Sequence, residues 1–245
     1  MLMKSLFVVA LLAALIVPAQ PALSHASTPT LRSKKICRPL LEQAAAGRKV
    51  SFMNCNLRNL DLSEFKFWGL DLRKANFSGA ILIDASFNGS DLRKANFSGA
   101  DLRGSEVDGL INGANFSGAN LAGVRELGNE GLRRVNFSGA DLTGVFLQDR
   151  VVIKVNFSNA NLTAANLSGL NLSGLDFTGA NLSDAQLSGA NFSRAKLINA
   201  NLSGADIRDG ADLSFADLTG AILDGADLTG AILTGATMPD GTIHD

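Results

Sequence analysis

The decapeptide DLRKANFSGA occupies residues 71–80 and returns unchanged at residues 91–100, twenty positions later. Within its first copy, Leu72 and Phe77 are large apolar residues five positions apart, and the small Ala75 precedes Phe77 by two. A five-residue period fits neither the 3.6-residue period of a helix nor the two-residue alternation of a flat strand. It fits a coil in which each pentapeptide contributes one short straight segment and one corner.

The same period runs through most of the chain. From residue 51 onward a large apolar residue returns at nearly every fifth position, with a small residue two positions before it. One column of phenylalanines follows the twenty-residue spacing: Phe77, Phe97, Phe116, Phe137, Phe157 and Phe177. One residue is missing before Phe116 and one extra residue precedes Phe137, so the spacing is restored after one coil. Four pentapeptides per coil predict a four-sided solenoid in which each residue stacks on its counterpart at about 4.8 Å.

The repeated A(D/N)LXX pattern resembles the pentapeptide-repeat family. Instances are ANLSGL at 165–170, ANLSDA at 180–185 and ADLTGA at 216–221. The resemblance implies an all-β fold, a right-handed quadrilateral β-helix with four pentapeptides per coil and about nine to ten coils. Members of this family perform unrelated functions, and their best-understood role is to imitate DNA and so bind topoisomerases. The ending ATMPDGTIHD at 236–245 is similar to the tails of cyanobacterial members.

The N-terminus has the parts of a signal peptide. Lys4 precedes an apolar run from Leu6 to Val17, which is too short to span a bilayer comfortably. Residues 1–26 are therefore predicted to be removed, by cleavage after Ser24 or after Ala26, and a retained membrane anchor is the alternative. The chain is then exported, to the periplasm or to the thylakoid lumen, and no membrane span remains after cleavage.

Two further segments follow the signal peptide. Residues 27–50 lack the five-residue period and are predicted to form an N-terminal cap whose short helix, near 39–46, ends at Gly47. Residues 51–245 form the solenoid, with an irregular loop at 124–131 and a register slip at 208–210. Cys37 in the cap and Cys55 in the first coil are expected to form a disulfide in an oxidising compartment, two buried free thiols being the alternative.

The sequence contains no arrangement of residues typical of an enzyme. His244, one residue from the end, is the one histidine beyond the predicted signal peptide, and no base stands near a cysteine or serine nucleophile. The many Asp and Asn residues before Leu or Phe occupy the second position of the repeat. The sequence therefore predicts no catalytic, cofactor-binding or metal site.

Charged residues suggest a binding surface instead. Because residues about twenty positions apart stack in successive coils, a set of basic residues falls on one side of the rod. This set is predicted to be a partner-binding stripe: Arg73, Lys74, Arg93, Lys94, Arg133, Arg134, Lys154 and Arg194. The stripe is interrupted at 112–113. Charge is also distributed unevenly along the axis, because residues 27–200 hold 20 basic and 15 acidic residues, whereas 201–245 hold eight Asp and one Arg.

The pattern breaks between residues 124 and 131. Glu126 falls where an inward apolar residue is expected, so a bulge is predicted in which Leu127 takes the inward place. Arg150 falls on a small-residue position, twenty residues after Glu130, and these two are expected to pair across adjacent coils.

The sequence thus predicts a non-enzymatic structural or interaction rod of an exported compartment that docks an unknown protein partner along one face. A DNA-mimicking topoisomerase-binding protein is the alternative, but the basic stripe and the signal peptide disfavour it. A polysaccharide-acting β-solenoid enzyme on the irregular side is a further alternative. Direct binding of nucleic acid is not expected, because aromatic residues are not interleaved with the basic ones. The oligomeric state stays open.

Overall fold

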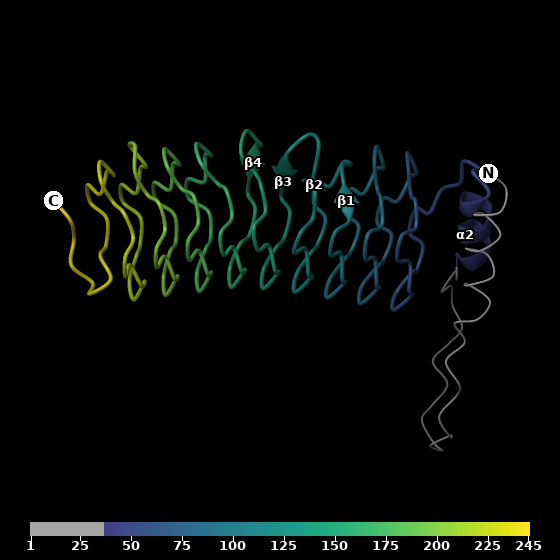
Figure 1. Cartoon of the computed structure of the whole chain (residues 1–245), viewed down its shortest axis with the longest axis horizontal. Helices are drawn as coiled ribbons and strands as arrows, with labels where there is room; N and C mark the ends of the chain where they lie inside the picture. Colours follow the sequence, from purple (N-terminus) through teal and green to yellow (C-terminus); the bar gives the residue numbers. More distant parts are fainter. Residues whose placement is uncertain (1–36) are drawn as a thin grey trace, which may run out of the picture.

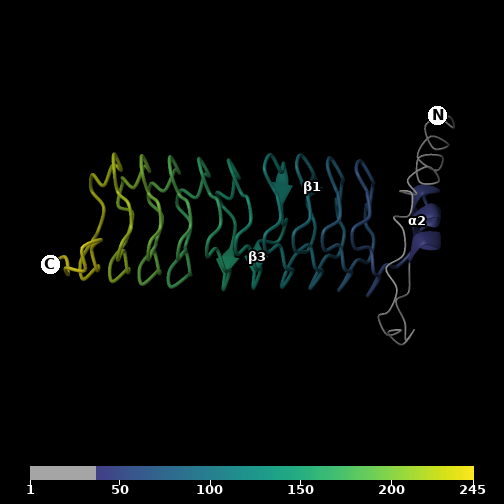
Figure 2. The same cartoon turned by 90° about the horizontal axis from the view of Figure 1, so that it is seen from below.

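The computed structural model describes residues 37–245, which form a rod of stacked coils with a helix at its N-terminal end (Figure 1). The orthogonal view shows the same stack along its whole length (Figure 2). The predicted signal peptide, residues 1–26, and the first part of the predicted cap, residues 27–36, lie outside the described residues.

Parallel pairing between residues one coil apart holds the stack together. Asn76 pairs with Asn96, and Asn156 pairs with Asp176, each across twenty residues. Pairing over two consecutive residues forms the four strands, β1 (Glu106–Val107) with β2 (Glu126–Leu127) and β3 (Leu132–Arg133) with β4 (Val152–Ile153). Elsewhere the contact is a single bridge, because each side of a coil is one pentapeptide long and must also turn a corner. This register is that of four pentapeptides per coil.

Columns of like residues fill the inside of the rod. The rings of Phe77 and Phe97, and those of Phe97 and Phe116, are parallel to within 2° with centroids 4.8 Å apart. These side chains are fully buried, as are the small residues beside them such as Ala75. Burying a Phe or Leu side chain stabilises a fold by ~1.5–3 kcal/mol. Because the columns are continuous, each coil is stabilised mainly by its neighbours.

The N-terminal helix α2 (Arg38–Ala45) lies where the sequence predicts one. Pro39 is tolerated in its first turn, where a backbone N–H has no helical partner. Gly47 follows its end with a left-handed φ of 75°, and its N–H bonds to the carbonyl of Ala44 at 2.8 Å. Leu41 is fully buried in the core of the rod. A disulfide joins Cys37, before the helix, to Cys55 in the first coil.

The residues that follow the last coil close the C-terminal end of the rod only in part. The chain folds back, with an antiparallel bridge between Thr237 and Ile243, and Met238 packs against the core. The side chain of Ile243, however, is 62% exposed. Three leucines of the last coil are consequently only partly buried: Leu223, Leu228 and Leu233.

The segment predicted as an irregular loop, 124–131, contains β2, which pairs with β1 in the regular register of twenty residues, and the extra residue lies after it, because Asn115 pairs with Asn136 twenty-one positions on. In β2 the side chain of Leu127 is buried and that of Glu126 is exposed. Near 208–210 the pairing changes from twenty residues, at Gln186 and Asp206, to twenty-one, at Asn191 and Asp212. The extra residue is accommodated at a corner, where Asp209 and Gly210 both adopt left-handed φ.

Candidate partner-binding face

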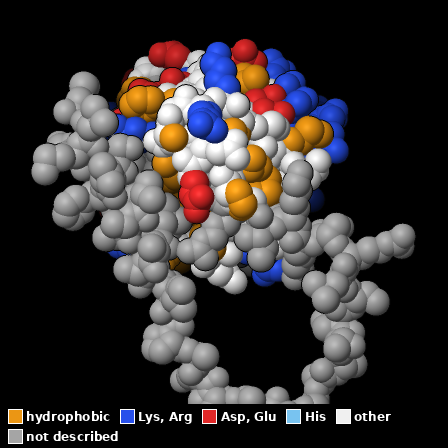
Figure 3. All heavy atoms as spheres, turned by 90° about the vertical axis from the view of Figure 1, so that its right-hand side faces the viewer, with side chains coloured by type: hydrophobic (Ala, Val, Ile, Leu, Met, Phe, Trp, Pro, Cys, Tyr) orange, Lys and Arg blue, Asp and Glu red, His pale blue; other side chains and the backbone are white. Residues whose placement is uncertain are grey.

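The residues of the predicted stripe lie on one side of the rod, called the basic face below. Equivalent segments of successive coils form it: 71–74, 91–94, 110–113, 131–134, 151–154, 171–174 and 191–194. The bridge between Asp71 and Asp91 and the β3–β4 pair join neighbouring segments of this face. Viewed from the N-terminal end, Lys and Arg side chains gather along the upper and right-hand outline of the rod, with acidic side chains among them (Figure 3).

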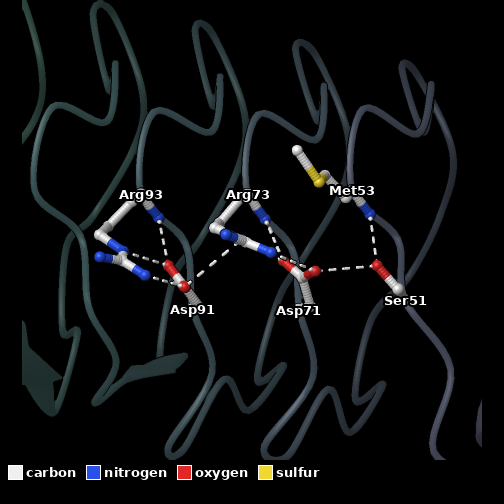
Figure 4. Close-up of polar contacts among 6 residues, drawn as sticks. All are labelled: Ser51, Met53, Asp71, Arg73, Asp91 and Arg93. Carbon is white, nitrogen blue, oxygen red and sulfur yellow. Dashed lines mark hydrogen bonds and ion pairs between the residues drawn. The ribbon is translucent and has the colours of Figure 1, made fainter.

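Two arginines of the stripe are paired with acidic neighbours in their own coil. Arg73 Nε donates to Asp71 Oδ1 at 2.8 Å, and its Nη2 donates to Asp71 Oδ2 at 2.9 Å. Arg93 and Asp91 form the same fork, and Arg73 Nε also lies 3.6 Å from Asp91 Oδ2. Ser51 donates to Asp71, so a continuous chain of polar contacts runs along three coils (Figure 4).

A short sequence signal produces these forks. Residues i and i+2 of an extended segment point to the same side, so Asp and Arg separated by one apolar residue meet above it. Every D-[L/I]-R tripeptide of the described residues forms such a pair: 71–73, 91–93, 101–103 and 206–208. The predicted stripe includes Arg73 and Arg93, whose charges are therefore paired in the structure with the Asp two residues before each of them.

The forks lower the pKa values of the carboxyl groups. The hydrogen bond from Arg73 is the main cause that holds the pKa of Asp71 at about 2, and the bond from Ser51 adds to it. Arg93 lowers the pKa of Asp91 in the same way. In both cases partial burial opposes the shift, because it disfavours the charged form.

A pH dependence of stability follows from these shifts. Since each folded pKa lies below the unfolded value of about 3.9, the forks contribute stability that is present above that pH. This stability is lost as the pH falls through the folded pKa, which for Asp71 is about 2. We expect the Asp71→Asn, Asp91→Asn variant to show a smaller decrease in the free energy of unfolding over this pH range than the wild type, by denaturant titration. The Arg73→Gln, Arg93→Gln variant should behave similarly, and an unchanged pH dependence in both would contradict the assignment.

Of the six other basic residues of the face, Arg133 lies in β3 and the remaining five stand at its corners. These five are exposed and adopt left-handed φ angles between 53° and 62°: Lys74, Lys94, Arg134, Lys154 and Arg194. Within residues 37–245 these are the only Lys and Arg residues with positive φ, and none of the ion pairs of this part of the chain includes them. The Arg194 guanidinium lies 5.4 Å from the ring centre of Phe215. The unpaired positive charge of the face therefore comes mainly from its corners.

The predicted pairing of Glu130 with Arg150 is wrong. The Arg150 guanidinium donates instead to Glu126 Oε2 at 2.8 Å and to the carbonyl of Gly128 at 3.0 Å. In a regular coil that carbonyl accepts from the preceding coil, as Asp108 O does from Gly89 N at 2.7 Å. Here Gly109 N bonds to Val107 O, which leaves the Gly128 carbonyl to the arginine. Arg150 thus replaces a missing backbone bond in the coil that contains β2.

The described part of the chain shows few other chemical features. No group of three or more His, Cys, Asp and Glu side chains within residues 37–245 could hold a metal ion. No helix in the same range is long and apolar enough to cross a membrane.

Comparison with known proteins identifies the repeat. The family model described as "Pentapeptide repeats" matches in eight copies, over residues 71–106, 156–194, 176–210 and 211–240. The solved structure of HetL, a pentapeptide repeat protein involved in heterocyst differentiation regulation from the cyanobacterium Nostoc sp. strain PCC 7120, is 32% identical over 84% of this chain and 98% of its own. The chain belongs to the pentapeptide-repeat family. The TM-score with HetL is 0.28.

Two further pentapeptide-repeat structures are similar at lower identity. QnrB1, a plasmid-mediated fluoroquinolone resistance protein, is 20% identical over 74% of this chain and 92% of its own, with a TM-score of 0.25. A pentapeptide repeat protein from the thylakoid lumen of Arabidopsis thaliana is 23% identical over 77% of this chain and 72% of its own, with a TM-score of 0.15. No curated protein sequence matches the chain. At these values the two structures carry no argument about the role of this pentapeptide-repeat protein.

Proposed function

We propose that this pentapeptide-repeat protein is a non-enzymatic rod that docks an acidic surface of a partner protein on its basic face. The five corner residues with left-handed φ carry the proposal. An L-residue in this conformation costs about 1–2 kcal/mol, whereas glycine adopts it freely. Glycine stands at many other corners, such as Gly79 and Gly99. Other faces also have non-glycine corners in this conformation, such as Glu64, Asp84 and Ala164, but within residues 37–245 only the corners of the basic face carry Lys or Arg.

The geometry of the corners suits a large, flat and charged partner surface. Equivalent corners in adjacent coils are separated by the strand spacing of about 4.8 Å. Lys74 and Lys94 occupy adjacent coils, as do Arg134 and Lys154, and backbone hydrogen bonds join each pair of coils, from Lys74 N to Arg93 O at 3.1 Å and from Arg134 N to Ile153 O at 2.8 Å. The partner therefore meets a pre-ordered row of charges and orders few loops on binding. Exposed charges of this kind mainly accelerate association and are screened by salt.

The alternative functions receive less support from the same residues. In a polysaccharide-acting enzyme, Glu126 would serve as a general acid or base, but its carboxylate is paired with Arg150. A DNA mimic presents a strongly acidic surface, whereas the full chain has a formal net charge of −1 and the rod has unpaired basic corners on one face.

Export and the ends of the rod are part of the proposal. The composition of residues 1–26 supports a removable signal peptide, and so a location in the periplasm or the thylakoid lumen. The buried Leu41 and the Cys37–Cys55 disulfide support a capping role for α2, which would cover the open edges of the first coil. The length of the repeat region supports about nine to ten coils.

A corner variant separates binding from folding. In the variant Lys74→Gly, Lys94→Gly, Arg134→Gly, Lys154→Gly, glycine removes both the strain and the charge, so we expect an unfolding temperature equal to or above that of the wild type. In affinity capture from the exported fraction, the wild type should retain an acidic partner that added salt elutes. The corner variant should not retain this partner. The matched control, Asn159→Gly with Asp184→Gly, changes two left-handed corners on other faces and should retain the partner. Identical capture by the wild type and the corner variant would refute the proposal.

A further inference from the structure

The hydrogen-bond ladder of the basic face is open between segments 151–154 and 171–174. On either side it is regular, because Arg134 N bonds to Ile153 O at 2.8 Å and Leu172 N bonds to Asn191 O at 2.8 Å. By the same register the N–H groups of Val152 and Lys154 would donate to the carbonyls of Asn171 and Ser173. Neither bond is present among the described residues, and no bridge joins the two segments.

A surface hollow of about 440 Å³ occupies this opening. Its apolar walls include Val152, Val155 and Leu175, and its polar rim includes Lys154, Ser173 and Asp176. Two more apolar side chains stand exposed at the opening, Val151 at 47% and Ile153 at 39%. Apolar and charged groups thus converge on one site of the basic face.

The local sequence accounts for the opening. Residues 151–153 are Val, Val and Ile, where the next coil has Asn, Leu and Ser at 171–173. Such β-branched residues favour extended backbone, and here they form β4, which pairs with β3 of the preceding coil. The turn bond that Leu175 N makes to Leu172 O at 3.2 Å has no equivalent at Val155. Segment 151–155 is therefore hydrogen-bonded to the preceding coil through β3 and is not hydrogen-bonded to segment 171–174 of the next coil.

We propose that this opening binds an extended segment of a partner protein in which an apolar side chain lies beside an acidic one. The unpaired N–H groups of Val152 and Lys154 are donors for the backbone of such a segment, as an open sheet edge is for an added strand. The apolar side chain fits against Val155 and Leu175. The acidic one faces Lys154, with Arg133 and Arg134 of the neighbouring coil nearby, on the side away from Asp176.

This inference rests on the proposed docking function of the basic face and names what one part of it recognises. The corners provide charge over several coils, whereas the opening adds backbone pairing and an apolar contact at one position. The opening therefore supplies sequence selectivity that a row of charges lacks.

The test uses a synthetic peptide that alternates Val and Glu over six residues, with the full mature chain. We expect it to bind and to slow amide hydrogen exchange at Val152 and Lys154. A peptide with Lys in place of Glu, and free glutamate, should bind about tenfold more weakly or not at all. Equal binding of all three probes, or binding without protection of these two amides, would overturn the inference.

A repaired ladder provides the matched variant. Val151→Asn, Val152→Leu, Ile153→Ser copies residues 171–173 of the regular coil, so it should close the opening and raise or preserve the unfolding temperature. Peptide binding should fall about tenfold or more, whereas corner-dependent capture of an acidic partner persists, because Lys74, Lys94, Arg134 and Lys154 are unchanged. If the peptide fails to bind the wild type while that capture persists, this inference fails and the proposed function stands. If capture is also independent of the corners, both fail.

Discussion

Replacing Phe97 by alanine is expected to lower the free energy of unfolding by about 3–5 kcal/mol. The Phe97 ring is fully buried and stacks on Phe77 and Phe116 at 4.8 Å on either side. It also meets the edge of Phe87 at 5.6 Å. Removing the ring leaves a void that rigid neighbouring coils fill poorly, so the loss includes both the transfer term and the cavity term.

The matched control for this variant is Phe146→Ala. The Phe146 side chain is 60% exposed, so removing the same ring there should change the free energy of unfolding by no more than ~1 kcal/mol. Both values are measured by denaturant titration followed by circular dichroism. Similar losses for the two variants would show that the phenylalanine column does not dominate the stability of the rod.

The second large effect is expected at the N-terminal end. The disulfide between Cys37 and Cys55 closes a loop with a sequence separation of 18 residues. Its removal in the Cys37→Ser, Cys55→Ser variant should destabilise α2 and the first coil by about 3 kcal/mol, because the unfolded segment then gains freedom. Amide hydrogen exchange measures this opening free energy residue by residue.

Two comparisons make the result interpretable. Amides near Phe157, in the middle of the rod, should exchange at the same rate in the variant and the wild type, because each coil is stabilised mainly by its neighbours. A reducing agent should destabilise the wild-type segment to the level of the variant and leave the variant unchanged. If the exchange of α2 is identical in both proteins, the disulfide does not anchor the helix.

The repeat predicts most of the fold because each pentapeptide places a small and a large apolar residue at the same two positions. The identical decapeptides at 71–80 and 91–100 carry the twenty-residue register, and the Phe77–Phe97 stack follows from it. The inward position of Leu127 is also predictable, because alternation leaves only one of two consecutive residues inside. The burial of a residue at a regular position of the repeat can therefore be predicted without knowing its contacts in other coils.

The candidate site was less predictable for identifiable reasons. The partner of Arg73 stands two residues away, at Asp71, and a search for acidic residues at this spacing would have found it. The partner of Arg150 could not be found in that way. It depends on the carbonyl that Gly109 leaves free in another coil, which is a property of the three-dimensional backbone. The opening beside Val152 likewise depends on whether segment 151–155 forms its hydrogen bonds with the preceding coil or with the next one.

The twenty-residue register also determines how this rod can change in length during evolution. Insertion of a whole coil adds about 4.8 Å to the rod and keeps Lys94 and Arg134 on the same side. Insertion of a single pentapeptide turns every later residue by one side of the square and places Lys154 on a different face from Lys74. A one-residue change is absorbed at a corner, as at Asp209 and Gly210. Descendants that retain a row of basic corners are therefore expected to differ in length by multiples of about twenty residues.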